Sequence, residues 1–271
     1  MGVPLILTSP HSGNYYPKFY IDNLITSLDL SRSIEDMYVN EFIENYTDRD
    51  ITILTNKYSR AVIDLNRNIN ELDNRLVESS EGLKSINTQK VQSGIGLIPV
   101  QTAKGKILFK KKFSLERFRF LQKNVYLKWH EELRNNIDKK LSSYNKIFLI
   151  DLHSMPSENE NINLPDFVLG NVNGLTCKDE NISFISNQFK GLGYSVSLNN
   201  PYSGGYITES YFNENIGIQT LQIEINKKLY MDENTFTKKR GFDLLRINIQ
   251  RVISNFTDYF VNNISKKFAA E

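Results

Sequence analysis

The stretch KIFLIDLHSMPSE, residues 146–158, leads from a run of aliphatic side chains into a histidine and then a proline. A continuous apolar run of this length is typical of a strand that is buried on both faces of a parallel sheet. Ligands bind such sheets beyond the carboxyl ends of the strands, and His153 follows the run there. The stretch predicts either a strand that carries a histidine to the rim of a sheet or a strand that simply ends.

Segments with the patterns of strands and helices surround this stretch. Short apolar runs predict strands at 3–9, 51–55, 61–66, 166–171, 194–198 and 218–225. Apolar side chains that recur every three or four residues predict helices at 31–46, 115–140, 182–189 and 237–267. Ser114 is a candidate N-cap for the second of these helices. Because strands and helices alternate, we expect an α/β fold: a single domain with a mixed, mostly parallel sheet flanked by helices.

The polar segment 68–105 interrupts this alternation. The sequence GLIPVQTAKGKILF, residues 96–109, overlaps its end and predicts a hairpin that turns near Gly105. Long segments without regular structure often carry function, so we predict that 68–105 is a lid or specificity insert. A surface loop without such a role is the alternative.

The composition limits the partners and the location of the protein. The chain has 271 residues, of which 24% are charged, and its formal net charge is only +2, which gives no support to nucleic acid or a membrane surface as a partner. The single cysteine, Cys177, excludes an internal disulfide and a cysteine-based zinc site. No run approaches the roughly 18 apolar residues of a membrane span. We therefore expect a cytoplasmic protein.

Two of the 3 histidines, His11 and His153, follow apolar runs. If the two predicted strands are parallel neighbours, both imidazoles lie at the same edge of the sheet. A catalytic zinc site needs about three protein ligands, and two imidazoles with one carboxylate meet that need. The helix predicted after the first strand offers Glu35 and Asp36 as the acidic ligand. The alternative is that each strand-end histidine only forms hydrogen bonds. His130 lies in the long predicted helix, where a packing or supporting role is expected.

The strand predicted at 218–225 carries a glutamate among core-type residues. Glu224 is costly to bury unless it is paired, and near a zinc ion it could serve as a general base. A half-buried strand with one polar face is the alternative reading of the same alternation.

Arginine and tyrosine side chains near other predicted strands suit an anionic substrate. Arg60 precedes the strand predicted at 61–66, and Asn66 with Arg67 ends it, where a guanidinium fork could bind a carboxylate. Tyr206 follows the glycine pair of a turn-rich loop and could donate a hydrogen bond to a reacting oxygen. Structural ion pairs and a simple tight turn are the alternatives.

Taken together, these motifs resemble one family, the N-formylglutamate amidohydrolases. The resemblance extends from Pro10 to about Glu233 and rests on seven stretches in order: PHSG (10–13), EDMYVNEF (35–42), SRAVIDLNRN (59–68), DLHSMP (151–156), DFVLGN (166–171), NNPYSGGYI (199–207) and LQIEINKKLYMDE (221–233). That family is similar to the zinc carboxypeptidases. The resemblance implies their phosphorylase/hydrolase-like architecture and one zinc ion per chain.

The resemblance also implies roles for individual residues. The zinc ligands would be His11, His153 and an acidic residue, with Asp36 favoured over Glu35; Glu224 would be the general base. Arg60, Asn66 and Arg67 would hold substrate carboxylates or polarise the scissile carbonyl, Tyr206 would face the substrate, and His130 would support the site.

The reaction implied is hydrolysis of a small anionic N-acyl amino acid, such as N-formyl-L-glutamate, to formate and the free amino acid. A carboxypeptidase-like or cell-wall amide hydrolase on the same zinc site, or a carboxylate-binding module without catalysis, are the alternatives.

Overall fold

The computed structural model describes residues 2–44, 46, 50–79, 82–102, 105–159 and 162–268. The chain forms two compact units. Unit 1 comprises Met1–Ser9, Tyr38–Leu54 and Asn136–Glu271, and unit 2 comprises Pro10–Met37 and Thr55–Asn135. The expectation that 1–271 is one domain stays a prediction. Among the described residues, no helix is long and apolar enough to cross a membrane.

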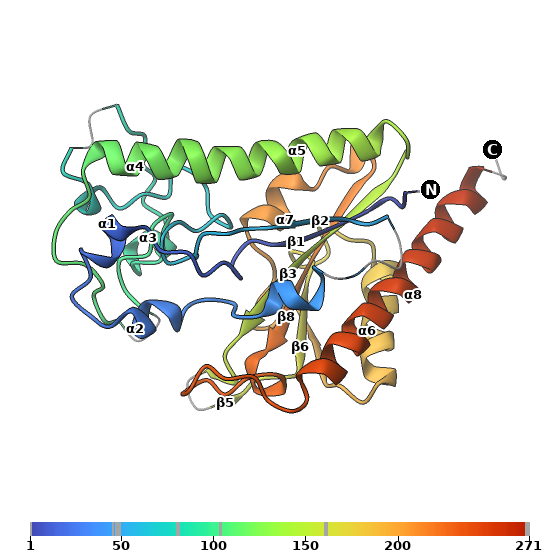
Figure 1. Ribbon diagram of the computed structural model, residues 1–271. Coiled ribbons are helices and arrows are strands. Elements are labelled where there is room, and N and C mark those ends of the chain that lie inside the picture. Colours follow the sequence, from blue (N-terminus) through green and yellow to red (C-terminus); the bar gives the residue numbers. More distant parts are fainter. Residues whose placement is uncertain are drawn as a thin grey trace. The chain divides into compact units, whose positions relative to one another are not determined.

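Unit 1 is built on a six-stranded sheet (Figure 1). Its strand order is β2 (Thr52–Thr55), β1 (Leu5–Ser9), β3 (Ile147–Met155), β8 (Ile218–Asn226), β6 (Phe167–Gly170) and β7 (Val196–Leu198). The β1–β3, β3–β8 and β6–β7 pairs are parallel, whereas β6 and β8 are antiparallel. This confirms the predicted mixed, mostly parallel sheet. The predicted strand with His153 is the central strand β3, and every one of its residues is buried.

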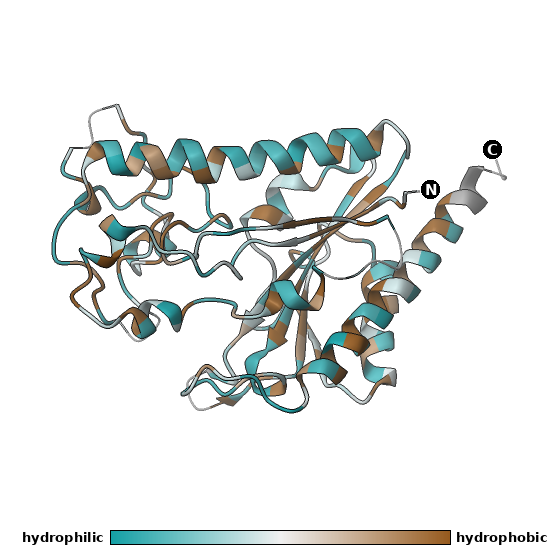
Figure 2. Cartoon of the chain, in the orientation of Figure 1, coloured by the Kyte–Doolittle hydropathy of each residue, from teal (hydrophilic) through white to brown (hydrophobic). Residues whose placement is uncertain are grey.

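Helices cover both faces of this sheet. Phe148 of β3 packs against Phe256 and Phe260 of α8 (Phe242–Phe268), with ring centroids 4.7 and 5.3 Å apart. On the other face, Thr220 of β8 donates to the carbonyl of Thr208 in α7 (Tyr206–Tyr211) at 2.6 Å. Helix α8 also packs against α6 (Asp179–Gly191), and Figure 2 shows hydrophobic and hydrophilic bands alternating along it.

Short elements complete unit 1. They are η1 (Val39–Phe42), β4 (Glu158–Asn159), β5 (Ile162–Asn163), η4 (Glu214–Ile216) and η5 (Lys227–Leu229). The predicted helices at 182–189 and 237–267 correspond to α6 and α8, so both are confirmed.

Unit 2 is mostly irregular and is lined by one long helix. Its short elements are α1 (Lys18–Ile21), α2 (Leu28–Arg32), η2 (Asn74–Leu76) and α3 (Gln89–Gln92). The long helix consists of α4 (Leu115–Leu121), a π-helical turn η3 (Gln122–Leu127) and α5 (Lys128–Leu141), whose last residues belong to unit 1. The prediction at 115–140 is confirmed, and Ser114 caps the helix by accepting the N–H of Arg117 at 3.3 Å.

The single helix predicted at 31–46 is wrong. Helix α2 ends at Arg32, and the chain is irregular until η1 begins at Val39. The N–H of Asp36 donates to the carbonyl of His11 at 3.1 Å, so it does not close a helical turn. Tyr38 has a φ of +67°, and a residue with this left-handed conformation cannot continue a right-handed helix. Asp36 therefore lies on a loop, and residue 45 of the predicted helix lies outside the described ranges.

The strand predicted at 61–66 is also wrong. The N–H groups of Val62 and Ile63 donate to the carbonyl of Ser59 at 2.9 and 3.3 Å, which makes a turn. Ala61, Val62, Ile63 and Leu65 are nevertheless fully buried. The apolar run thus reflects burial of a loop and not a strand.

The segment 68–105 belongs to unit 2. Gly105 has a φ of +72°, and Gln101 pairs with Ile107 in antiparallel fashion, as expected of the predicted hairpin turn. Residues 80–81 and 103–104 of this segment lie outside the described ranges. Its role as a lid stays a prediction.

Candidate active site

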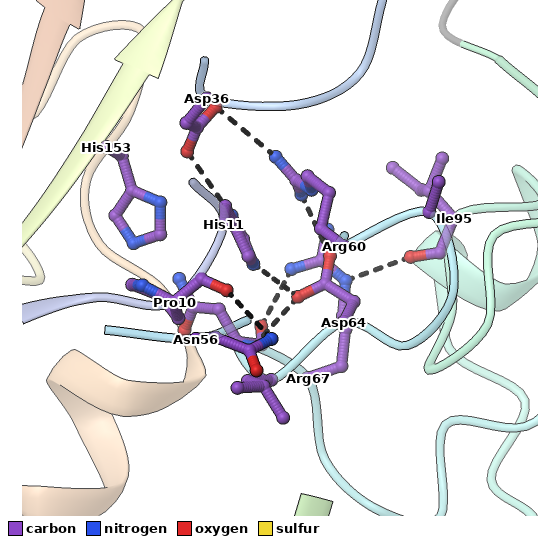
Figure 3. A network of polar contacts seen from close by, with 12 residues as sticks. Pro10, His11, Asp36, Asn56, Arg60, Asp64, Arg67, Ile95 and His153 are labelled. Atoms are coloured by element: carbon purple, nitrogen blue, oxygen red, sulfur yellow. Dashed lines mark hydrogen bonds and ion pairs between the residues drawn. The ribbon is translucent and has the colours of Figure 1, made fainter. Parts of the chain in front are cut away.

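His11 of unit 2 lies between two carboxylates (Figure 3). Its Nε2 is 2.6 Å from Oδ1 of Asp64, and its Nδ1 is 3.4 Å from Oδ2 of Asp36. All three side chains are buried. In the neutral imidazole, a proton on Nε2 is donated to Asp64 and the lone pair remains on Nδ1. His11 thus presents a ligand-type nitrogen toward Asp36.

The separation of these two atoms suits a zinc ion. A tetrahedral zinc ion with nitrogen and oxygen ligands at about 2.0–2.1 Å holds neighbouring ligand atoms about 3.4 Å apart. His11 Nδ1 and Asp36 Oδ2 are separated by 3.4 Å, which is longer than an ordinary N–H···O hydrogen bond. The hydrogen bond from His11 to Asp64 is the orienting contact that metal-binding histidines usually make with a carboxylate. The donor pair in unit 2 therefore fits this metal.

Glu35, the other acidic candidate, faces a different set of partners. Its Oε1 accepts a hydrogen bond from the hydroxyl of Tyr16, and its Oε2 lies 3.6 Å from Nε of Arg32. Burial raises the pKa of the Glu35 carboxyl above its usual value, although these partners and Ser59 act to lower it. Of the two neighbouring carboxylates, Asp36 is the one that faces His11.

Asp64, a residue that no sequence motif singled out, is the centre of the polar network in unit 2. Beside His11, it accepts from Nη2 of Arg60 at 2.8 Å and from the backbone N–H of Asn66 at 2.8 Å. Burial alone would raise the pKa of the Asp64 carboxyl, but the contact with His11 and the charges of Arg60 and Arg67 hold it well below its usual range. Asp64 is therefore ionised and orients the imidazole of His11.

The two arginines predicted to bind substrate lie at this network. Arg60, with 21% of its side chain exposed, bridges Asp64 and Asp36, whose Oδ1 is 3.8 Å from Arg60 Nη1. Arg67 donates to the carbonyls of Ile95 and Asn66, each at 2.9 Å, and its side chain is 10% exposed. Much of the donor capacity of Arg67 thus goes to the protein's own backbone.

The π-helical turn η3 and the first turn of α5 support the loop that carries Asp64. The hydroxyl of Tyr126 donates to the carbonyl of Arg67 at 2.7 Å, and Nε2 of His130 lies 3.0 Å from the carbonyl of Leu65. The rings of Tyr126 and His130 are in contact, with centroids 4.3 Å apart. Within unit 2, the buried side chain of His130 therefore supports the backbone of the loop that carries Asp64.

Gly13, two residues after His11, lies against another segment of unit 2. A Cβ atom at this position would be 2.4 Å from the carbonyl oxygens of both Asn56 and Tyr58. Since these are backbone atoms, they cannot turn aside as the end of a flexible side chain can. The glycine of the PHSG motif thus permits close backbone packing beside His11.

We expect Gly13→Ala to lower the free energy of unfolding by about 2 kcal/mol, because the new methyl group overpacks this contact. For a chain of this size that corresponds to a fall in Tm of roughly 5 °C. Gly191→Ala is the control, because nothing lies within 4 Å of a Cβ there. Thermal unfolding followed by circular dichroism measures both, and equal Tm values for the two variants would contradict the prediction.

His153 of unit 1 is held by a carboxylate on its own strand. Asp151 and His153 are two residues apart on β3 and therefore point to the same face of the sheet. Nε2 of His153 is 2.8 Å from Oδ2 of Asp151, whose Oδ1 accepts from the hydroxyl of Thr8 at 2.6 Å. Asp151, which was not among the predicted site residues, is thus a buried orienting group like Asp64.

Glu224 lies beside His153 in the same sheet. The register of β3 and β8 pairs His153 with Glu224 and Asp151 with Gln222, so their side chains share one face. Nε2 of Gln222 donates to Oε1 of Glu224 at 2.8 Å, and both side chains are buried. The sheet therefore groups a carboxylate, an imidazole and an amide near the carboxyl ends of two neighbouring strands.

Tyr206 is the first residue of α7 and is half-buried. The loop before it lies close to β6, since a Cβ atom on Gly170 would be 2.7 Å from the backbone of Ser203. Gly170 pairs with Gln222 across the antiparallel β6–β8 contact, so both positions point to the same face. The loop that leads to Tyr206 thus covers the face of the sheet that carries Glu224.

Comparisons with known proteins agree on one family. A family model described as N-formylglutamate amidohydrolase matches residues 3–231. The N-formylglutamate deformylase of Pseudomonas putida is 28% identical over 244 residues, which cover 85% of this chain and 83% of that protein. The N-formylglutamate deformylase of Pseudomonas aeruginosa is 25% identical over 238 residues, with the same two coverages.

Solved structures give the same result. The crystal structure of N-formylglutamate amidohydrolase from Ralstonia eutropha JMP134 matches with a TM-score of 0.91 and 25% identity, covering 97% of this chain and 96% of that one. A gene product of Agrobacterium tumefaciens, at 15% identity and a TM-score of 0.70, covers 95% of this chain and 92% of that one, and shares the fold. The resemblance of the seven motifs is therefore confirmed: this chain belongs to the N-formylglutamate amidohydrolase family, which consists of hydrolases of a linear amide C–N bond.

Proposed function

We propose that this chain is a zinc-dependent deformylase that hydrolyses N-formyl-L-glutamate, or a close N-acyl amino acid, to formate and the free amino acid. The observation that carries the proposal is the buried His11–Asp36 pair, whose ligand atoms have the spacing of two zinc ligands, in a chain of this family. We also propose that the protein acts in the cytoplasm on a small anionic substrate. Nucleic acid and membranes are not among its proposed partners.

The proposed ligands of the ion are His11, Asp36 and His153. Each offers one atom of the type that zinc prefers, and all three are buried. The pairing of β1 with β3 places Thr8 opposite Asp151 in the sheet of unit 1. His11 follows the end of β1 by two residues, and His153 lies near the carboxyl end of the adjacent parallel strand β3.

The ion and the side chains have separate roles in the proposed reaction. When bound, a zinc ion supplies Lewis-acid chemistry, since it polarises a carbonyl group and favours attack by water near neutral pH. The Glu224 carboxylate takes a proton from the attacking water and returns it to the nitrogen of the departing amino acid. Asp64 and Asp151 hold the two imidazoles in the tautomer that leaves Nδ1 as the ligand atom.

The proposed substrate-binding groups are those predicted from the sequence: two arginines, an asparagine and a tyrosine. Arg60 has the more exposed guanidinium of the two arginines and is proposed to polarise the formyl oxygen. Arg67 and Asn66 hold the shape of the adjoining loop. Both are proposed to bind the substrate carboxylates, Arg67 through its positive charge and Asn66 through its side-chain amide. Tyr206, at the start of α7, is proposed to donate its hydroxyl proton to the substrate.

Metal analysis combined with an assay tests the proposal. We expect purified protein to contain about one zinc ion per chain and to release formate from N-formyl-L-glutamate. N-acetyl-L-glutamate and a dipeptide with C-terminal glutamate, assayed in parallel, separate a deformylase from an aminoacylase or a carboxypeptidase. Protein that binds no zinc and stays inactive after zinc is added would refute the proposal and favour a carboxylate-binding module.

A further inference from the structure

We propose that Gln222 has two roles in this site: it positions the base Glu224, and it recognises the N–H of the amide bond that is cut. The inference rests on the proposed function and adds a residue that recognises the substrate. Two observations on β8 support it: the hydrogen bond between Gln222 and Glu224, and the buried side-chain oxygen of Gln222.

The hydrogen bond fixes the orientation of both side chains. Gln222 and Glu224 are two residues apart on β8, which places them on one face of the strand. Nε2 of Gln222 donates to Oε1 of Glu224 at 2.8 Å. Because an ionised carboxylate only accepts hydrogen bonds, the amide group must turn its nitrogen to Glu224 and its oxygen away. Gln222 thereby restricts the rotation of the Glu224 carboxylate.

The oxygen of this amide is buried, and the described residues offer it no donor. Only 3% of Gln222 is exposed, and no group in the described part of the chain donates to its Oε1. Leaving such an acceptor unpaired is unfavourable, and buried polar groups in native proteins nearly always have a partner. A donor that arrives with the substrate would satisfy it.

The neighbours of Gln222 in the sheet do not supply that donor. Opposite Gln222 on β3 lies Asp151, whose carboxylate accepts from the hydroxyl of Thr8 and lies against His153. Opposite it on β6 lies Gly170, which has no side chain. The residue thus has an acceptor on one side and only backbone on the other.

The chemistry of the substrate class identifies the missing donor. At neutral pH an N-formyl amino acid with ionised carboxylates has only one hydrogen-bond donor, the N–H of the formamide. That N–H lies on the nitrogen to which Glu224 must return a proton, so an acceptor next to Glu224 is suitably placed to hold it. Gln222 Oε1 would therefore bind the scissile amide by its nitrogen and distinguish it from an ester or a tertiary amide.

The test compares Gln222→Met with wild-type protein on two substrates. Methionine keeps the length and volume of the side chain but makes neither hydrogen bond. We expect kcat for N-formyl-L-glutamate to fall about 10-fold to 100-fold, with zinc content unchanged. We also expect the preference of the wild type for this substrate over N-formyl-N-methyl-L-glutamate to shrink about 10-fold.

Gln219→Met is the matched control, because it changes the same residue type on the same strand. Gln219 lies on the opposite face of β8 and accepts from the N–H of Lys178 and the amide of Asn181, both at 2.9 Å. We expect its kcat and its substrate preference to stay within about twofold of wild type, whatever the change in Tm.

Two outcomes are distinct. If wild-type protein hydrolyses N-formyl-L-glutamate and Gln222→Met matches it in kcat or keeps the full preference against the N-methyl substrate, the inference is overturned and the function stands. If wild-type protein does not hydrolyse the formyl substrate, the proposed function fails and the inference fails with it. Slowed exchange of the Gln222 side-chain amide protons in ¹⁵N NMR spectra checks the bond to Glu224 without any substrate.

Discussion

Glu224→Gln is expected to lower kcat for N-formyl-L-glutamate by about 10³-fold while the zinc content of the protein stays the same. The substitution keeps the shape of the side chain and removes the carboxylate that is proposed to take the proton from water. Glu224 is 8% exposed and lies beside His153, a proposed zinc ligand, in the β3–β8 register.

The effect on kcat should exceed the effect on KM, because proton transfer contributes mainly in the transition state. Steady-state kinetics of formate release, with zinc measured on the same samples, provide the comparison. Glu214→Gln, at an exposed glutamate of η4 in the same unit, controls for the loss of one negative charge. If Glu224→Gln retained a tenth or more of wild-type kcat, Glu224 would not be the base.

The central strands of the fold could be predicted from the sequence because burial on both faces leaves a clear signal. All nine positions of β3 are buried, and its apolar run stands out from the polar segments around it. His11 and His153 were identifiable because each follows such a run directly. The place of a residue at the end of a strand is a local property, so local pattern reveals it.

The orienting carboxylates Asp64 and Asp151 were not predicted, for two different reasons. Asp151 stands two residues before His153 on one strand, so the period of two in a strand already places both side chains on one face, and the sequence carries that signal. Asp64 lies in a loop that was read as a strand, and its contact with His11 joins residues that are 53 positions apart. No local pattern encodes a contact of that range.

The wrong helix at 31–46 has a similar cause. Its apolar residues recur at helical spacing because Met37, Val39, Phe42 and Ile43 are all buried. The conformation of the backbone is instead determined by hydrogen bonds to distant parts of the chain, as the bond from the N–H of Asp36 to the carbonyl of His11 shows. The helical spacing of these apolar residues therefore predicts their burial correctly and the secondary structure incorrectly. It also does not indicate which of Glu35 and Asp36 faces His11.

Substitution of either proposed histidine ligand is expected to remove the metal. Loss of one ligand from a three-residue set should weaken zinc binding by at least about 100-fold, which exceeds the roughly 10-fold to 100-fold effect of losing an orienting carboxylate. We therefore expect His11→Ala and His153→Ala each to lose zinc on dialysis and to be inactive. Asp64→Asn and Asp151→Asn should retain zinc with lower affinity.

The remaining histidine provides a matched control for this experiment. His130 is also buried, but its Nε2 is 3.0 Å from the carbonyl of Leu65 and it is not among the proposed ligands. His130→Ala should lose stability and keep its zinc, whereas the two ligand variants should lose zinc while circular dichroism shows that they remain folded. Loss of zinc from both variants would support His11 and His153 as ligands of the same ion. Zinc retained in folded His153→Ala, with full loss in His11→Ala, would contradict the proposal that His153 is a zinc ligand.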